Sequence, residues 1–217
     1  MIIVGGVYAE LVVRGGPIVA GDAAATSANI IANERTFRYG YAAQLNPLLC
    51  NMPLAVLLYE LLKIVNRRVA MLVVLFSVVG SAVEAATLLT HYAPLVLPKR
   101  GPELGVDQHL LQALTSMVLQ LQSIGFATAL TFFGGTCLAR GYLIYRSGFW
   151  PRIIGAFLAL EGVAYLADSF ANFIAPNVAP ALFAALLVTG LAEVILCLWL
   201  LIRGVNVERW YARAAGA

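Results

Sequence analysis

Four acidic side chains lie inside long apolar stretches of this sequence, where a charge is costly: Glu84, Glu161, Asp168 and Glu193. A charged residue at the centre of a membrane-spanning helix costs about 2.5–3.5 kcal/mol on insertion scales. We expect no Lys or Arg at the same depth as these acids. Their carboxyl groups must therefore be protonated and hydrogen-bonded, hydrated in a cavity, or neutralised by a bound cation or substrate.

Polar residues within the same stretches recur seven positions apart, as Glu84 and His91 do. Seven residues make almost two helical turns, so such pairs share one face of a helix. Five apolar stretches carry a polar face, which predicts a helical bundle with a polar cavity inside. The residues predicted to line this cavity are Glu84, His91, Gln122, Glu161, Tyr165, Asp168, Asn172 and Glu193.

The predicted depth of each residue in the bilayer indicates its role in this predicted cavity. At about 1.5 Å per helical residue, Glu84, Glu161 and Glu193 fall near the middle of the bilayer, where they would accept protons or cations. Asp168 and His91 fall towards the external face and would line the mouth of the cavity. The alternative is that the acids are neutral groups that hydrogen-bond between helices, each contributing about 0.6 kcal/mol.

Other kinds of chemistry have weaker support in the residues present. The spacing of His and Cys fits no tight set of metal ligands, so we predict no metal and no cofactor. Cys50, Cys137 and Cys197 lie in apolar runs without a CxxC pair, and we interpret them as small core residues. The sequence also lacks the G-x-S-x-G and H-E-x-x-H motifs, so we assign no catalytic residue.

The composition of the 217-residue chain predicts that its main partner is a lipid bilayer. The chain is 61% hydrophobic and 12% charged, whereas a soluble domain carries about 25% charged residues. The net charge of +3 is small and no basic cluster is present, so nucleic acid is excluded as a partner. We expect a single all-α transmembrane domain over residues 1–217.

The hydropathy pattern predicts a compact bundle of about six transmembrane helices. The first span, over residues 1–13, is short, because a helix of that length reaches only about 20 Å. A short helix over residues 23–32 is expected at the external interface. The later spans are predicted at about 38–62, 69–96, 108–145, 151–174 and 181–202.

The Lys and Arg residues in the short loops orient the predicted bundle. Nine lie on the side that carries the turns after the second and fourth spans and the tail, against five on the other side. The nine include Arg140, which is counted with the turn after the fourth span. This bias predicts a multi-pass protein of the inner (plasma) membrane with both termini in the cytoplasm.

Several blocks of this sequence together resemble one protein family. They are Gly21–Ile30, Val65–Arg67, Phe132–Gly134 with Cys137, Gly141–Gly148 followed by Pro151, Arg152 and Gly155, and Glu193 with Leu196–Leu200. Over nearly its whole length the chain resembles the bacterial multi-pass membrane proteins of domain of unknown function 4386. The resemblance implies an inner-membrane protein with six spans, and it supplies no activity.

Three functions remain open. The first is a membrane protein that binds or transports a small molecule or a proton in the polar cavity. The chain is small for a transporter and shows no inverted repeat, which a homodimer would compensate. The second is an intramembrane enzyme acting on a lipid-like substrate, with an acid as general acid or base. The third is an accessory or structural subunit whose polar stripes meet the helices of a partner.

Overall fold

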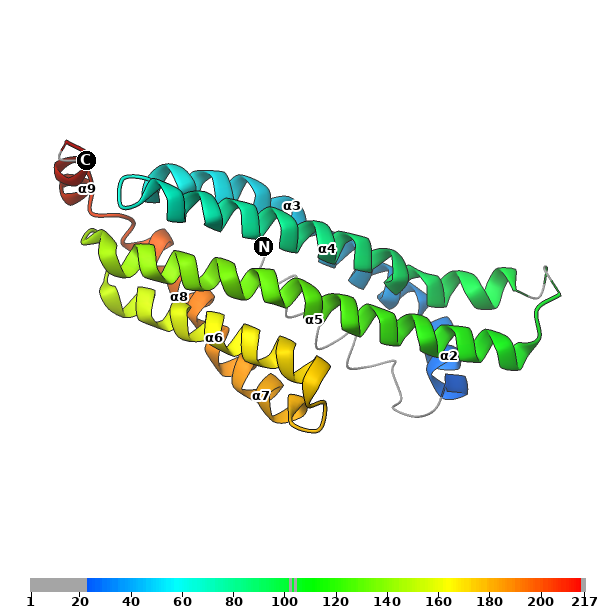
Figure 1. Ribbon diagram of the computed structural model, residues 1–217. Helices are drawn as coiled ribbons and strands as arrows, with labels where there is room; N and C mark the ends of the chain where they lie inside the picture. Colours follow the sequence, from blue (N-terminus) through cyan, green and yellow to red (C-terminus); the bar gives the residue numbers. More distant parts are fainter. Residues whose placement is uncertain (1–22, 102, 104, 216–217) are drawn as a thin grey trace. The chain divides into compact units, whose positions relative to one another are not determined.

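The computed structural model describes residues 23–101, 103 and 105–215. The predicted first span lies outside these residues. The regular structure in the described part is α-helical and contains no strand, which confirms the all-α prediction. The helices, shown in Figure 1, are α2 (Ala23–Ala32), α3 (Glu34–Leu62), α4 (Arg67–Arg100), α5 (Gln108–Ser147), α6 (Arg152–Ile174), α7 (Ala179–Thr189), α8 (Leu191–Ile202) and α9 (Val207–Ala215).

Four of these helices, α3 to α6, are long and apolar enough to cross a membrane, within the part of the chain that was searched. They correspond to the second, third, fourth and fifth predicted spans. The sixth predicted span consists of two shorter helices, α7 and α8, which meet at Gly190. Glycine is a poor helix former and a common site of kinks, which explains the interruption. The backbone stays close to helical there, because the Gly190 amide still donates a hydrogen bond to the Leu186 carbonyl.

The contacts divide the chain into two compact units. Among the described residues, the first unit combines residues 23–51 and 82–126 without 102 and 104, and the second combines residues 52–81 and 127–215. The helices α3, α4 and α5 therefore each contribute residues to both units. Each unit is described by itself below.

The first unit has an apolar core of Ile30, Phe37 and Leu95, against which Tyr92 and Leu119 pack. Helix α4 ends later than predicted. The prediction placed the end of the third span near residue 96, because of Pro94 and Pro98, but the helix continues through both prolines to Arg100. Leu95 is buried in the core beside Pro94, and Nζ of Lys99 pairs with Glu34 at 2.7 Å, so contacts within the first unit stabilise the helix on both sides of Pro98.

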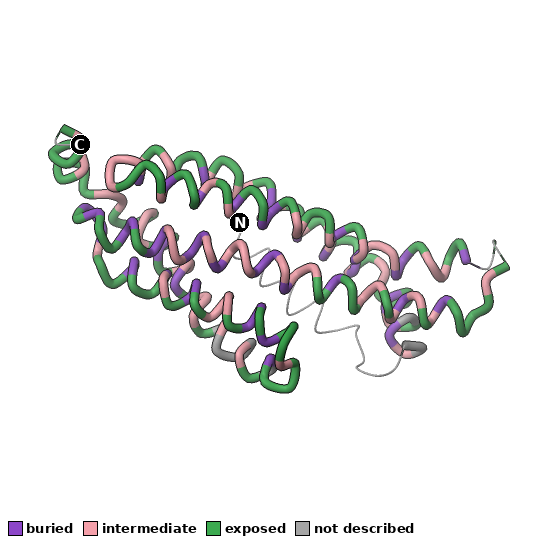
Figure 2. The backbone as a smooth tube through the Cα atoms, viewed as in Figure 1, coloured by how far each residue is buried: buried purple, intermediate pink, exposed green. Residues whose placement is uncertain are grey.

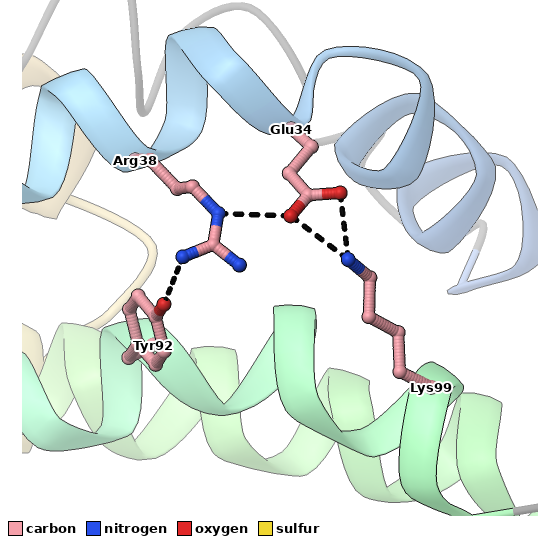
Figure 3. Close-up of polar contacts among 4 residues, drawn as sticks. All are labelled: Glu34, Arg38, Tyr92 and Lys99. Carbon is pink, nitrogen blue, oxygen red and sulfur yellow. Dashed lines mark hydrogen bonds and ion pairs between the residues drawn. The ribbon is translucent and has the colours of Figure 1, made fainter.

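Charged side chains connect the start of α3 to the end of α4 in the first unit. Figure 3 shows the Glu34 carboxylate between two cations, with Nε of Arg38 at 2.8 Å and Nζ of Lys99 at 2.7 Å. Arg38 also donates a hydrogen bond from Nη1 to the hydroxyl of Tyr92. These groups are largely exposed, so each pair contributes only about 0–1 kcal/mol to stability.

The second unit has a larger apolar core that includes Leu143, Ile144, Trp150 and Leu158. Helix α6 lies beside α7 and α8 (Figure 1). Buried residues recur along one side of α6, and Figure 2 shows exposed residues between them. The exposed positions are mostly apolar, as expected for helices that face lipid.

Small residues let α5 and α6 approach closely in the second unit. A Cβ atom added at Gly155 would lie 2.5 Å from the backbone nitrogen of Tyr145, and one added at Gly162 would lie 2.8 Å from the Gly134 carbonyl oxygen. Any larger residue at these positions would have to displace backbone. Glycines at a helix crossing are typical of membrane proteins, where association depends on close packing.

The chain after α8 folds back on the second unit as α9. The indole nitrogen of Trp210 donates a hydrogen bond to the Leu61 carbonyl at 3.0 Å, and Nη1 of Arg213 donates one to the Ser147 carbonyl at 3.2 Å. These carbonyls lie in the last turns of α3 and α5 and have no partner within their own helices. The tail is therefore an ordered part of the second unit.

We predict that Gly155→Val destabilises the protein by about 1–3 kcal/mol or more, because the new side chain overpacks a backbone contact. The free energy of unfolding, measured by titration with a denaturing detergent, checks this. Ala156→Val is the matched control, since Ala156 is exposed on the same helix and the new residue has the same helix propensity. Equal losses in the two variants would show that the crossing of α5 and α6 is not tight at Gly155.

Candidate functional site

The candidate site is built around Glu161, which is fully buried on α6. Tyr165 lies one turn further along the same face and donates a hydrogen bond from its hydroxyl to Oε1 of Glu161 at 3.3 Å. The second carboxyl oxygen, Oε2, is buried and has no hydrogen-bond partner among the described residues. Burying a polar atom in this state is costly unless the carboxyl group is protonated or the oxygen binds a ligand.

A second acid, Glu193, comes from the first turn of α8. Its Oε1 lies 3.4 Å from Nη1 of Arg140, which comes from α5. The side chain of Arg140 is 6% exposed and that of Glu193 is 37% exposed. The expectation that no Lys or Arg lies at the depth of the acids is therefore wrong.

The reason for this error is the length of α5. From its sequence position Arg140 is expected in the turn after the fourth span, but α5 continues to Ser147, so Arg140 lies about two turns inside the helix. Removing Arg140 from the loop residues leaves eight basic residues against five. The side that carries the turns after the second and fourth predicted spans and the tail therefore still has more basic residues than the other side.

Helix α5 also brings Cys137 to the same place. The Cys137 sulfur, one Glu161 oxygen and one Glu193 oxygen all lie within 4.8 Å of one another. The sequence analysis interpreted Cys137 only as a core residue, and Cys137 is indeed buried. The signal that could have identified it is its spacing, because Cys137 and Arg140 are three residues apart and share a face of α5. We call Cys137, Arg140, Glu161, Tyr165 and Glu193 the acidic cluster.

The charges of the acidic cluster do not balance by themselves. With both carboxyl groups ionised, Glu161 and Glu193 carry two negative charges against one positive charge on Arg140. Water screens little in such a buried place, so an excess charge is far more costly there than at a surface. One further positive charge, a bound cation or a proton, would neutralise the cluster.

Asp168 and Asn172 form a second polar group on α6. Asp168 is 3% exposed, and its Oδ2 accepts a hydrogen bond from the Asn172 amide at 3.3 Å. Asp168 follows Glu161 by seven residues, which is about 10 Å along the helix axis. Asp168 thus shares a helix face with Glu161 but is not among the residues of the acidic cluster.

The other predicted residues belong to the first unit. The Gln122 amide nitrogen lies 2.6 Å from Nδ1 of His91. The His91 ring is buried and stacks on Phe37, with 4.5 Å between ring centroids and 8° between ring planes. Glu84 is half-buried on α4. His91 and Gln122 thus form a packed polar pair within the first unit.

An open depression of about 530 Å³ lies at the start of α3, also in the first unit. Its lining residues are Ala32, Asn33, Glu34, Arg35, Thr36 and Arg38. None of the eight residues that the sequence predicts for the polar cavity lines this depression. The cavity shared by all eight residues stays a prediction.

Comparison with known proteins identifies one family and one relative. Residues 1–204 match the family described as domain of unknown function (DUF4386). The chain is also similar to an uncharacterized protein from Archaeoglobus fulgidus, with 26% identity over 157 residues, which cover 72% of this chain and 78% of that protein. No solved structure matches the chain.

We predict that Arg140→Met destabilises the protein by about 1–3 kcal/mol. Breaking a fully buried ion pair costs more, about 3–5 kcal/mol, but Glu193 is partly exposed and the loss is smaller in proportion. The double variant Arg140→Met/Glu193→Gln should recover much of this loss, because it removes the Glu193 carboxylate together with its cation and leaves the net charge of the acidic cluster as it is in the wild type. Free energies of unfolding of the wild type, both single variants and the double variant form the test. Additive losses would show that the two residues do not interact.

Proposed function

Since the chain belongs to the family of domain of unknown function 4386, which supplies no activity, we propose its role from its own residues: it is an integral inner-membrane protein that binds a small cation at the acidic cluster of its second unit. The observation that carries this proposal is the state of Glu161. This carboxyl group is fully buried, and its Oε2 has no hydrogen-bond partner among the described residues. A cation at this oxygen would satisfy both the geometry and the charge of the cluster.

The positions of the neighbouring side chains support a binding role. Tyr165 orients one oxygen of Glu161 and leaves the other available. Arg140 neutralises one of the two carboxylates, so the cluster retains one negative charge for a ligand. Replacing a buried ion pair by apolar residues of similar size is often neutral or stabilising in proteins, so stability alone does not account for these acids.

A proton is the competing occupant of the same site. Protonation of one carboxyl group would also balance the charge of Arg140, Glu161 and Glu193. The two occupants can be distinguished at constant pH, because the stabilisation by a metal or alkali cation increases with the logarithm of the cation concentration once this exceeds the dissociation constant. A proton-only site would not respond in this way.

The membrane and the orientation of the chain are part of the proposal. The helices α3 to α6 are long and apolar enough to span a bilayer. The bias of eight basic residues against five supports an orientation with the end of α5 and the C-terminal segment on the cytoplasmic side. A homodimer would provide two acidic clusters and would compensate for the small size of one chain.

We predict that a cation raises the unfolding temperature of the purified protein and that Glu161→Gln abolishes this effect. A ligand at 100 times its dissociation constant stabilises a protein by about 2.7 kcal/mol. The experiment measures thermal unfolding in detergent at one pH with Na⁺, K⁺, Mg²⁺, Ca²⁺, Mn²⁺ or Zn²⁺. The control is Glu60→Gln, because Glu60 is exposed and pairs with the nearby Lys63 at a helix end.

Two results would contradict the proposal: no cation stabilises the wild type, or Glu161→Gln responds as strongly as the wild type does. The first result would favour a proton-only or structural cluster. If a cation binds, its flux into proteoliposomes then separates transport from binding alone. A flux that is lost in Glu161→Gln and kept in Glu60→Gln would identify transport.

A further inference from the structure

We propose that the acidic cluster is a binding site for one divalent transition-metal ion of the zinc type, ligated by Cys137 through sulfur and by Glu161 and Glu193 through one oxygen each. This inference rests on the proposed function and adds two features to it. The cation is divalent and thiophilic, and a cysteine takes part in binding. The three ligands come from three different helices, α5, α6 and α8.

The distances between the three ligand atoms fit such an ion after small rotations of the side chains. Zinc binds cysteine sulfur at about 2.3 Å and carboxylate oxygen at about 2.1 Å, so tetrahedral ligands lie about 3.6 Å apart. The three atoms already lie within 4.8 Å of one another. Glu193 is partly exposed and can adjust, whereas Cys137 and Glu161 are held in the packed interior.

An observation independent of these distances also points to a ligand. Oε2 of Glu161 is buried without a hydrogen-bond partner among the described residues, while Oε1 accepts the hydrogen bond from Tyr165. This is the arrangement of a metal-binding carboxylate, in which one oxygen is oriented by a neighbouring donor and the other is left for the ion. Arg140 has the equivalent role at Oε1 of Glu193.

The charge of the cluster fits a divalent ion. Metal ligands are deprotonated when they bind, so a Cys137 thiolate and two carboxylates supply three negative charges. Arg140 supplies one positive charge at Glu193. The remaining two negative charges equal the charge of one divalent ion, and the site would then be neutral in the interior of the membrane.

The ligand set also selects among divalent ions. Mg²⁺ and Ca²⁺ bind through oxygen ligands alone, whereas thiolate sulfur favours zinc and similar transition metals. Three protein ligands leave the fourth tetrahedral position to water or another small molecule. The spacing of His and Cys in the sequence fits no tight set of metal ligands and predicts no metal, whereas the fold brings Cys137, Glu161 and Glu193 together from three helices.

The test is a titration of the purified full-length protein in detergent with Co²⁺, which occupies zinc sites and reports a cobalt–thiolate bond by a charge-transfer absorption band. We expect one Co²⁺ per chain, the band at saturation, and displacement of Co²⁺ by Zn²⁺. Cys137→Ser should abolish the band. Cys197→Ser is the matched control and should keep it, because Cys197 is exposed and lies outside the cluster.

A second variant keeps the test informative if Cys137→Ser folds poorly. Tyr165→Phe removes only the hydrogen bond to Glu161, so it should keep the band and weaken Co²⁺ binding by about 10–100-fold. The inference is overturned if no band forms, if the band persists in Cys137→Ser, or if Tyr165→Phe binds Co²⁺ as tightly as the wild type. If Na⁺ or Ca²⁺ stabilises the wild type through Glu161 while Co²⁺ gives no band, the proposed function stands and only the zinc-type site is wrong.

Discussion

The cost of burying charge among apolar helices is the constraint that shapes the second unit. Glu161 is fully buried, and Arg140 is nearly so. Water cannot screen these groups, so each charge needs a partner supplied by the protein or by a ligand. The positions of Arg140, Tyr165 and Glu193 all follow from this requirement. The acidic cluster is therefore a charge-balancing arrangement that is incomplete by one positive charge when both carboxyl groups are ionised.

Close packing of helices places the members of the cluster. Cys137 and Arg140 lie on α5 between two pairs of close backbone contacts, at Gly134 with Gly162 and at Gly141 with Gly155. Because small residues allow α5 and α6 to approach, a side chain of α5 can come within reach of the Glu161 carboxyl group. Helix α8 completes the group by presenting Glu193 from its first turn, just after the interruption at Gly190.

The fold was predictable from the sequence because the length of each apolar segment and the polar residues between segments are local properties of the chain. The four long helices and the short helix α2 follow directly from them.

The site was predictable only in part. The seven-residue spacing identified Glu161, and the helical repeat identified Tyr165. Arg140 was missed because an arginine near a turn is counted as a loop residue outside the membrane. Cys137 was missed because an isolated cysteine in an apolar run resembles a core residue. Contacts between helices determine which residues of α5, α6 and α8 meet. Such contacts cannot be predicted from the local pattern of a single sequence.

The contacts of α9 have a consequence for how the chain threads the bilayer. Trp210 is hydrogen-bonded to the end of α3 and Arg213 to the end of α5. In a chain whose helices span the membrane, residues in contact near helix ends must lie in the same aqueous compartment. The chain therefore crosses the membrane an even number of times between any two of three places: the end of α3, the end of α5, and α9. Helices α4 and α5 provide two crossings after α3. After α5, helix α6 provides one crossing, so α7 and α8 must together count as a single crossing despite the break at Gly190. For a chain in which α4, α5 and α6 each cross the bilayer, this parity pairs the spans without any count of basic residues.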